Sequence, residues 1–242
     1  MQDNNRKVIV LTGASKGIGK AIAEKEGQRH HLSLFSRSES EMKSILQSQD
    51  PALKSIYTVG DIKKEEDIRL CVEKTLQTFG RIDVLINNAG IGIFKRVDQF
   101  TYEEFDEIQK VNVYGSFLFT KYSLPNMIEN KSGYIINISS VAGLNGFKTG
   151  TAYSASKFAL NGFTESLRED VKQYGIGVCS ICPGGVKTEF GGKGLEKFQG
   201  NDFLLEPEDV ARTVSYLIDE SETSNTKLIE LKPRRRKEYR GK

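Results

Sequence analysis

Short apolar runs alternate along the chain with stretches in which apolar residues recur every three or four positions. The runs are rich in isoleucine, valine and leucine, a composition typical of strands that are buried on both faces of a parallel sheet. They predict seven strands, at residues 8–11, 32–35, 55–59, 82–86, 134–138, 177–182 and 228–231. The helical spacing predicts helices between several of these runs, among them residues 68–79, 102–121 and 207–219.

The regular alternation of strand and helix indicates a single α/β domain. No proline- or serine-rich linker interrupts it, and the sequence contains no internal repeat. Strands that alternate with helices form parallel sheets whose two faces are covered by those helices. The sequence therefore predicts one doubly wound domain over residues 1–231, with a seven-stranded, mainly parallel sheet. Residues 232–242 are expected to form a basic C-terminal tail.

One segment departs from this pattern. Residues 24–31, at the end of the first expected helix, contain only charged and polar side chains and one glycine, so the helix has no apolar face there. We therefore expect a frayed or shifted helix end. His30 and His31 are expected to lie on the surface after this helix.

Composition adds that the chain can bury a large core, since 38% of its 242 residues are hydrophobic and 28% are charged. No apolar run approaches the roughly 20 residues of a membrane helix. The first seven residues lack the apolar segment of a signal peptide. Three scattered cysteines, Cys71, Cys179 and Cys182, do not form a disulfide framework. We therefore expect a protein of the reducing cytoplasm with no membrane partner.

The net charge of +3 is unevenly distributed along the chain. Residues 232–242 hold seven lysines and arginines against Glu238, a net +6, which leaves −3 for residues 1–231. A basic chain end is typically a solvated segment, and binding to nucleic acid or to an acidic partner is the alternative. We expect the solvated tail and no nucleic-acid partner.

A glycine-rich turn directly follows the first predicted strand. Residues 12–19 read Thr-Gly-Ala-Ser-Lys-Gly-Ile-Gly and lead into a helix. The glycines let the backbone approach a phosphate, and the helix N-terminus supplies free N–H groups and the positive end of the helix dipole. The spacing is neither the common Gly-x-Gly-x-x-Gly nor that of a P-loop. Its place between strand and helix favours a phosphate site over a simple tight connection.

The end of the second strand indicates which dinucleotide is bound. An acidic residue at this position normally binds the ribose 2′-hydroxyl of NAD. This chain has Ser36 and Arg37 there, with Ser15 and Lys16 in the glycine-rich turn. Two cations and two hydroxyls suit a 2′-phosphate through charge-assisted hydrogen bonds. The pattern favours NADP(H); in the alternative, Arg37 only solvates the turn.

Tyr153 and Lys157 are four residues apart, which places both side chains on one face of a helix. A free phenol ionises near pH 10. A neighbouring ammonium stabilises the phenolate, so we expect Lys157 to lower the pKa of Tyr153 toward neutrality. Such a tyrosine is a general acid for a developing alkoxide or a general base for an alcohol. By itself the pair is common on solvated helix faces, so its interpretation depends on the other motifs.

Two further patterns are not expected to carry chemistry. Cys179 and Cys182 form a Cys-x-x-Cys, but residues three apart on a strand point to opposite faces, so the thiols do not meet. His30 and His31 have no accompanying ligand cluster, and no metal site is expected.

Taken together, the motifs resemble those of the short-chain dehydrogenase/reductase family, and the resemblance spans about residues 8–231. Besides the glycine-rich turn they are Asn87-Asn88-Ala89-Gly90, Asn112, Ser140, Tyr153-x-x-x-Lys157 and Pro183-Gly184-x-Val186-x-Thr188. Each motif is common alone, whereas the set in this order and spacing is specific. The resemblance implies a Rossmann fold, NADP(H) as cofactor, and a homodimer or homotetramer. The usual glycine-rich end after the last strand is replaced by basic residues, which leaves the family's C-terminal tetramer contact open.

The resemblance also implies roles for single residues. Ser140 would bond the substrate carbonyl, Tyr153 would donate the proton, and Lys157 would lower the pKa of Tyr153 and hold the nicotinamide ribose. Asn112 would keep a kink in its helix and anchor a water chain. Ser140 is preferred over Ser139 because thirteen positions to the tyrosine is the family's usual interval. The implied cofactor-binding residues are Gly13, Ser15, Lys16, Gly17, Ile18, Gly19, Arg37, Asp61, Ile62, Asn88, Ala89, Gly90, Tyr153, Lys157, Pro183, Gly184, Val186 and Thr188.

The expected activity is the NADPH-dependent reduction of a small ketone or aldehyde to the alcohol, with Tyr153 as proton donor. Residues 91–94 and 228–233 are similar to the sepiapterin-reductase-like branch of the family. Within the family, the alternative is a 3-oxoacyl-[acyl-carrier-protein] reductase whose acidic partner meets Lys187, Lys193 and Lys197. The alternative from another class is a catalytically silent nucleotide sensor with a nucleic-acid-binding tail. The intact Asn–Ser–Tyr–Lys set favours the enzyme.

The segment of residues 191–200 contains four glycines and two apolar anchors, Leu195 and Phe198. Glycines raise the conformational entropy of an open chain. We therefore expect this segment to close over bound substrate as a lid.

Overall fold

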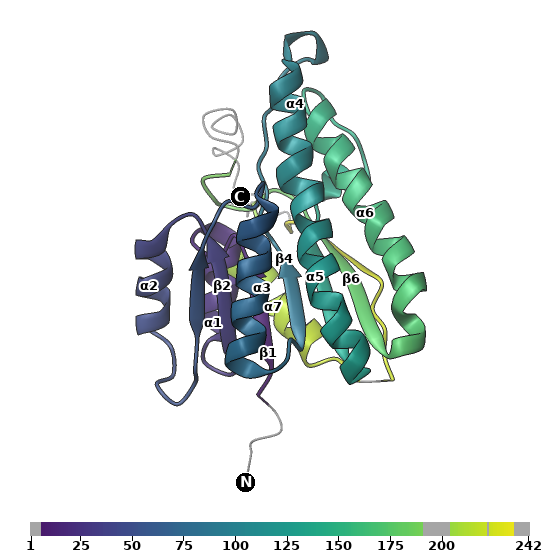
Figure 1. Ribbon diagram of the computed structural model, residues 1–242. Coiled ribbons are helices and arrows are strands. Elements are labelled where there is room, and N and C mark those ends of the chain that lie inside the picture. Colours follow the sequence, from purple (N-terminus) through teal and green to yellow (C-terminus); the bar gives the residue numbers. More distant parts are fainter. Residues whose placement is uncertain (1–5, 191–203, 222, 235–242) are drawn as a thin grey trace, which may run out of the picture.

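A single parallel sheet forms the centre of the molecule in the computed structural model, which describes residues 6–190, 204–221 and 223–234. Its seven strands run in the order β3-β2-β1-β4-β5-β6-β7, and every neighbouring pair is parallel (Figure 1). The strands are β1 Val8–Thr12, β2 His31–Ser36, β3 Ile56–Val59, β4 Val84–Asn87, β5 Gly133–Ile138, β6 Ile176–Pro183 and β7 Leu228–Leu231.

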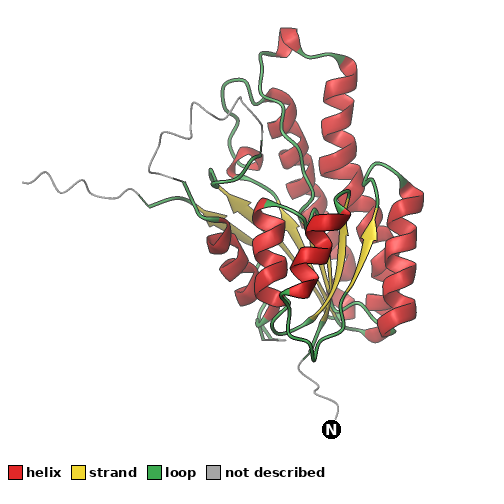
Figure 2. Cartoon of the chain, turned by 90° about the vertical axis from the view of Figure 1, so that its left-hand side faces the viewer, coloured by secondary structure: helices red, strands yellow, loops and turns green. Residues whose placement is uncertain are grey.

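Helices cover both faces of this sheet, as Figure 2 shows from the side. The first face packs against α1 Gly17–Glu26, α2 Glu39–Gln47 and α7 Pro207–Ile218. The second face packs against α3 Glu65–Phe79, α5 Gly115–Asn130 and α6 Thr151–Val171. α4 Tyr102–Gln109 continues through a π turn, Lys110–Tyr114, into α5. Single turns of 3₁₀-helix lie at Val97–Gln99, Val141–Gly143 and Lys172–Tyr174.

Alternate residues of each central strand enter different cores. Ile9 and Leu11 of β1 belong to the core under α1 and α7, whereas Val10 belongs to the core under α3 and α5. Each of the three residues exposes none of its surface. The near-continuous apolar run of β1 follows from this burial on both faces.

The predicted doubly wound fold is confirmed, and the predicted strands lie within two residues of those observed. The helix predicted at residues 102–121 extends to Asn130, with the π turn in its middle. The helix α2 was not predicted, because only Met42 and Ile45 of its nine residues are buried. Within the described residues, no helix is both long and apolar enough to span a membrane.

The strand order reverses direction between β1 and β4, which lie side by side in the middle of the sheet. The chain leaves β1 for the helix α1 on one face, and it leaves β4 for helices on the other face (Figure 1). The connections at the carboxyl ends of these two strands therefore separate and leave a crevice between them. Ligands bind in this crevice in open parallel sheets.

The expectation of a frayed helix end and of surface histidines is wrong at Glu26 and His30. α1 continues to Glu26, whose carbonyl accepts hydrogen bonds from the backbone of Arg29 and His30. Glu26 is fully buried and accepts a hydrogen bond from Ser215 of α7, and His30 exposes only 3% of its surface. Polar residues replace the apolar face here: Glu26 is bonded to Ser215, and His30 Nε2 lies 3.8 Å from Glu26 Oε2, beyond hydrogen-bond distance. Only His31, the first residue of β2, is partly exposed.

This buried pair titrates abnormally. Burial raises the pKa of Glu26, while burial and, to a smaller extent, Arg29 lower the pKa of His30 to about 4. His30 Nδ1 accepts a hydrogen bond from the amide of Lys7, so the proton of the neutral ring is on Nε2 and faces Glu26. Folded His30 therefore stays neutral under mildly acidic conditions in which an unfolded histidine becomes charged.

We predict that His30→Gln makes protein stability less sensitive to mild acid. A histidine with a lowered pKa contributes stability that is present above pH 6.5 and is lost as the pH falls through about 4. The loss due to His30 amounts to about 3 kcal/mol, at about 1.4 kcal/mol per pKa unit. Glu26 acts in the opposite direction, and both proteins retain it. Urea unfolding between pH 7 and pH 4 should show a smaller decrease for His30→Gln than for the wild type. The control His31→Gln should keep the wild-type slope, and an unchanged slope in His30→Gln would refute the prediction.

Candidate active site

The glycine-rich turn after β1 is shaped to receive a phosphate. Gly13 and Gly17 have φ angles of +65° and +51°, which side chains other than glycine rarely adopt. A Cβ on Gly19 would lie 2.1 Å from the Gly13 carbonyl oxygen, so the turn permits only glycine there. α1 begins at Gly17 without a side-chain cap, which leaves the amides of its first turn available to an anion. These features fit a dinucleotide pyrophosphate.

The segment after β4 holds this turn in place. Asn88 Nδ2 donates to the carbonyl oxygens of Thr12 and Gly13, at 3.0 and 3.1 Å. The hydroxyl of Thr12 accepts from the amides of Asn88 and Ala89, both at 3.0 Å. A Cβ on Gly13 would lie 2.8 Å from Ala89 Cα. Two motifs about 75 residues apart in sequence thus form one rigid edge of the crevice.

The residues predicted to select the nucleotide meet at the end of β2. Ser36 Oγ donates to Ser15 Oγ over 2.8 Å, which joins the β2 end to the glycine-rich turn. Arg37 is exposed and forms no ion pair with any described residue. Lys16 Nζ lies 3.2 Å from Glu189 Oε2, but both side chains are mostly solvated, at 62% and 84% exposed. Such a pair contributes less than about 1 kcal/mol, so it does not withhold Lys16 from a phosphate.

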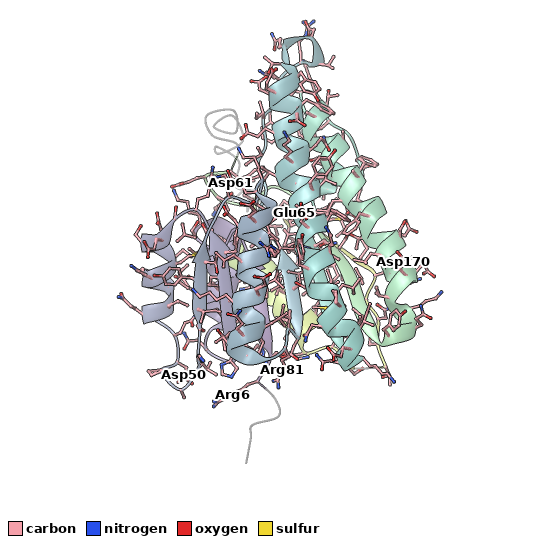
Figure 3. The ribbon with its side chains drawn as sticks, in the orientation of Figure 1. Arg6, Asp50, Asp61, Glu65, Arg81 and Asp170 are labelled. Carbon is pink, nitrogen blue, oxygen red and sulfur yellow. The ribbon has the colours of Figure 1, made fainter. Side chains whose placement is uncertain are left out.

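Several other predicted cofactor residues lie around the same crevice. Asp61 follows β3 at the carboxyl ends of the strands, whereas Arg81 lies at the opposite end of α3 (Figure 3). Ile62 is buried, and a Cβ on Gly115 would lie 2.4 Å from its side chain, which leaves only its backbone to flank an adenine.

Thr188 lies against the glycine-rich turn, since a Cβ on Gly17 would be 2.9 Å from it. The Gly184 amide donates to the carbonyl of Leu231 at the end of β7, and Val186 forms an isolated β-bridge with Leu205.

Asn112 lies in the π turn and connects two segments of the site. Its Oδ1 accepts from the amide of Ile91 at 2.8 Å, and its Nδ2 donates to the Ile91 carbonyl and to Ser156 Oγ, both at 2.9 Å. A π turn is the helix irregularity that the resemblance implied at this residue. Asn112 therefore holds the loop after β4 against α6, the helix that carries Tyr153.

The two adjacent serines after β5 face different ways. Ser139 Oγ donates inward to the carbonyl of Lys157 at 3.4 Å. Ser140 Oγ caps the 3₁₀ turn Val141–Gly143 by accepting from the Ala142 amide, and it donates to the Pro183 carbonyl at 3.4 Å. The same hydroxyl lowers the pKa of Tyr153, so it lies beside that side chain. The position beside Tyr153 supports Ser140 as the serine of the predicted catalytic set.

Tyr153 and Lys157 are both buried on α6, at 8% and 4% exposed. Burial raises the pKa of Tyr153 to about 12, against a smaller lowering by the Ser140 hydrogen bond, and burial lowers the pKa of Lys157 to about 8. The expectation that Lys157 brings the pKa of Tyr153 toward neutrality is therefore wrong for this arrangement. Lys157 Nζ donates to the Ile138 carbonyl at 2.9 Å and lies 5.8 Å from the tyrosine ring centre, so burial outweighs its attraction. Tyr153 keeps its proton at neutral pH, which is the form that a proton donor requires.

A buried amide ladder supports the site and was not predicted from the sequence. Asn87 Nδ2 donates to Asn137 Oδ1, and Asn137 Nδ2 donates to Thr164 Oγ1, both at 2.8 Å. The two asparagines are register partners on β4 and β5, and Thr164 is on α6. This ladder fixes α6 relative to the sheet. Its only sequence signal was an asparagine at the end of each of two apolar strands.

Three phenylalanines around Tyr153 were also missed. They are Phe94, Phe147 and Phe190, and they come from three separate loops. The predicted lid at residues 191–200, with Lys193, Leu195, Lys197 and Phe198, lies outside the described residues, as does most of the basic tail.

Comparison with known proteins identifies the family of this chain. The family model for short chain dehydrogenases matches residues 7–197. An uncharacterized oxidoreductase of Thermotoga maritima is 39% identical over 185 residues, which make up 76% of this chain and 73% of that protein. The chain belongs to the short-chain dehydrogenase family and is an oxidoreductase.

Two solved structures of the family are closely similar in fold. An alcohol dehydrogenase from the archaeon Thermococcus sibiricus, complexed with 5-hydroxy-NADP, has a TM-score of 0.85 and 29% identity, over 97% of this chain and 100% of that one. A metagenomic short-chain oxidoreductase in complex with NADP has a TM-score of 0.83 and 31% identity, over 95% and 98% of the two chains.

Proposed function

We propose that this protein is an NADPH-dependent reductase that converts a small ketone or aldehyde to the alcohol. The observation that carries the proposal is the buried Tyr153 beside Ser140, with Lys157 one helical turn away, at the carboxyl edge of the sheet. The phosphate-shaped turn and the uncompensated Arg37 support NADPH as the cofactor. The two solved relatives that hold an NADP-type nucleotide add to this support.

Different residues of this chain bind the cofactor, orient the substrate and transfer the proton. The nicotinamide supplies the hydride when the cofactor is bound. Gly13, Gly17 and Gly19 admit the pyrophosphate, and Asn88 keeps their turn in shape. Ser140 hydrogen-bonds the carbonyl oxygen of the substrate and thereby orients it.

Two residues of α6 take part in the proton transfer. Tyr153 donates its proton to the same carbonyl oxygen as negative charge develops there. The charge that remains on the tyrosine oxygen favours protonated Lys157, one helical turn away. Asn112 holds the loop after β4 at a fixed position relative to α6. In the proposed mechanism it also anchors the water chain that returns a proton to Tyr153.

The acyl-carrier-protein alternative gains no support from the described part of the chain. Its basic rim was to include Lys187, and Glu206 places a carboxylate beside that ammonium, so the surface there is not uniformly basic. Of the other two lysines nothing is described. The likeness to the sepiapterin-reductase-like branch stays a prediction.

Turnover tests the proposal against a silent nucleotide sensor. The full chain is incubated with diacetyl or a panel of simple aldehydes, and the absorbance of NADPH is followed. We expect NADPH oxidation matched by alcohol formation, with NADPH preferred over NADH by about ten-fold or more, since each charge-assisted bond contributes about 1.5–3 kcal/mol. Tight NADPH binding without turnover of any carbonyl compound would favour the sensor instead.

We also propose a cytoplasmic homodimer or homotetramer, with residues 1–231 as the folded domain. The three cysteines are free and buried, which fits a reducing compartment. Phe105, Tyr114 and Phe117 are exposed along α4, the π turn and α5, and Phe158 is exposed on the neighbouring α6. Such an apolar face suits a second copy of the chain. A monomer in light scattering would contradict the assembly.

A further inference from the structure

Three phenylalanine rings cluster beside Tyr153, two in contact with its ring and the third packed on Phe94. The ring centre of Phe94, from the loop after β4, lies 5.5 Å from that of Tyr153. The ring centre of Phe190, from the segment after β6, lies 5.6 Å from that of Tyr153. Phe147, from the loop before α6, lies 5.8 Å from Phe94. Phe94 also lies 6.5 Å from Phe190, so it touches every other ring of the group. We call these three residues the phenylalanine cluster.

The neighbouring backbone is adapted to this cluster. A Cβ on Gly92 would lie 2.7 Å from the Phe94 ring and 2.8 Å from the Phe190 ring, so glycine lets the two rings converge. A Cβ on Gly150 would lie 2.4 Å from the Phe147 ring. Thr149, between Phe147 and Gly150, has a φ of +68°, which is strained for a β-branched residue. Strain of this kind persists where the surroundings hold a segment in one conformation, often at a binding site.

Two lysines close to the cluster in sequence each lie against a carboxylate. Lys95, next to Phe94, forms an ion pair with Glu104. Lys187, three residues before Phe190, forms one with Glu206. Ser140 lies beside the Tyr153 side chain, and the buried Lys157 ammonium lies 5.8 Å from its ring centre. Apart from these polar groups of the expected catalytic set, the neighbours of Tyr153 described above are aromatic rings.

We propose that the substrate is an aryl-bearing carbonyl compound whose ring is held by the phenylalanine cluster, with Phe94 as the main specificity-determining residue. This inference rests on the proposed function and deepens it. A carbonyl oxygen that binds Ser140 and Tyr153 directs the rest of the substrate toward the rings that flank Tyr153. Offset or edge-to-face contacts with two or three phenylalanines favour a flat ring over an alkyl or charged group.

The exposure of Phe147 supports this direction. Phe147 leaves 43% of its surface in water while one side of its ring rests on Phe94. A substrate ring that covers this surface removes apolar area of both partners from water, which favours binding. Phe147 therefore forms the outer part of the ring site, and Phe94 forms the part next to the reacting carbonyl.

The test compares two diketones that differ only in the ring. Diacetyl and its phenyl analogue, acetylbenzoyl, carry the same adjacent carbonyl groups. We expect wild-type kcat/KM with NADPH to be at least about ten-fold higher for acetylbenzoyl, the size of effect that apolar pocket contacts produce. Phe94→Ala should lower this ratio by about ten-fold, and Phe147→Ala should lower it less. The ratio cancels any general effect of Phe94→Ala on Tyr153.

A matched control is Tyr216→Ala, which removes an exposed aromatic side chain, 59% exposed, on α7 and outside both the site and the apolar face proposed for assembly. It should leave the ratio unchanged. A wild-type ratio near one, or a ratio that survives both Phe94→Ala and Phe147→Ala, would overturn the inference while leaving the proposed function intact.

Failure of the proposed function is distinguishable, because neither diketone would then consume NADPH. Calorimetric titration of acetophenone into the protein with NADP⁺ then decides the ring site. Binding that Phe94→Ala weakens by ten-fold or more supports the site. Absent binding, or binding that Phe94→Ala leaves unchanged, refutes it.

Discussion

Replacing Tyr153 by phenylalanine is expected to lower kcat for carbonyl reduction by about 10²–10⁴. The change removes the hydroxyl that donates the proton and keeps the ring, so the contacts of Phe94 and Phe190 with residue 153 remain. NADPH binding should stay close to wild type, because the glycine-rich turn and Asn88 are untouched. Steady-state kinetics with diacetyl and a fluorescence titration with NADPH measure the two quantities.

The matched control is Tyr102→Phe, which removes the hydroxyl of a tyrosine that is 78% exposed on α4. Its kcat should equal that of the wild type. If the Tyr153→Phe protein kept about half of its activity, Tyr153 would not be the proton donor.

Replacing Arg37 by aspartate should shift the cofactor preference from NADPH toward NADH. The arginine is the cation at the end of β2, where a 2′-phosphate would lie, and no described residue neutralises it. Its loss removes a charge-assisted bond worth about 1.5–3 kcal/mol, which is about 10- to 150-fold in affinity. The new carboxylate repels a phosphate and accepts a hydrogen bond from the 2′-hydroxyl of NADH. We expect kcat/KM to fall with NADPH and to rise with NADH, so that the preference narrows or reverses.

Arg69→Asp is the control for this change of net charge. Arg69 is 56% exposed on α3 and pairs with Glu73, away from the β2 end. It should leave the NADPH-to-NADH ratio as in the wild type. Equal efficiency of the wild-type protein with both cofactors would show that Arg37 does not select the nucleotide.

The strands could be predicted because burial on both faces of the sheet requires a continuous run of apolar residues. Ile9, Val10 and Leu11 enter two cores on opposite faces, so the run has to be apolar throughout. α2 was missed because its contribution to the core is small, and a helix with two buried residues has little periodicity to detect. Glu26 and His30 were misjudged for a different reason. Their burial depends on Ser215, a partner 189 residues from Glu26.

The sequence by itself determined the fold and the family, and it predicted the phosphate turn and the catalytic set. Glycines at positions where a Cβ would collide, and a tyrosine and a lysine one helical turn apart, are local constraints that can be read from spacing alone. The tertiary structure alone decided the protonation of that set and its aromatic surroundings. Burial keeps the proton on Tyr153, and Phe94, Phe147 and Phe190 meet there from three distant loops. Both properties depend on which surfaces the fold removes from water, and that is a property of the packed chain and not of any one segment.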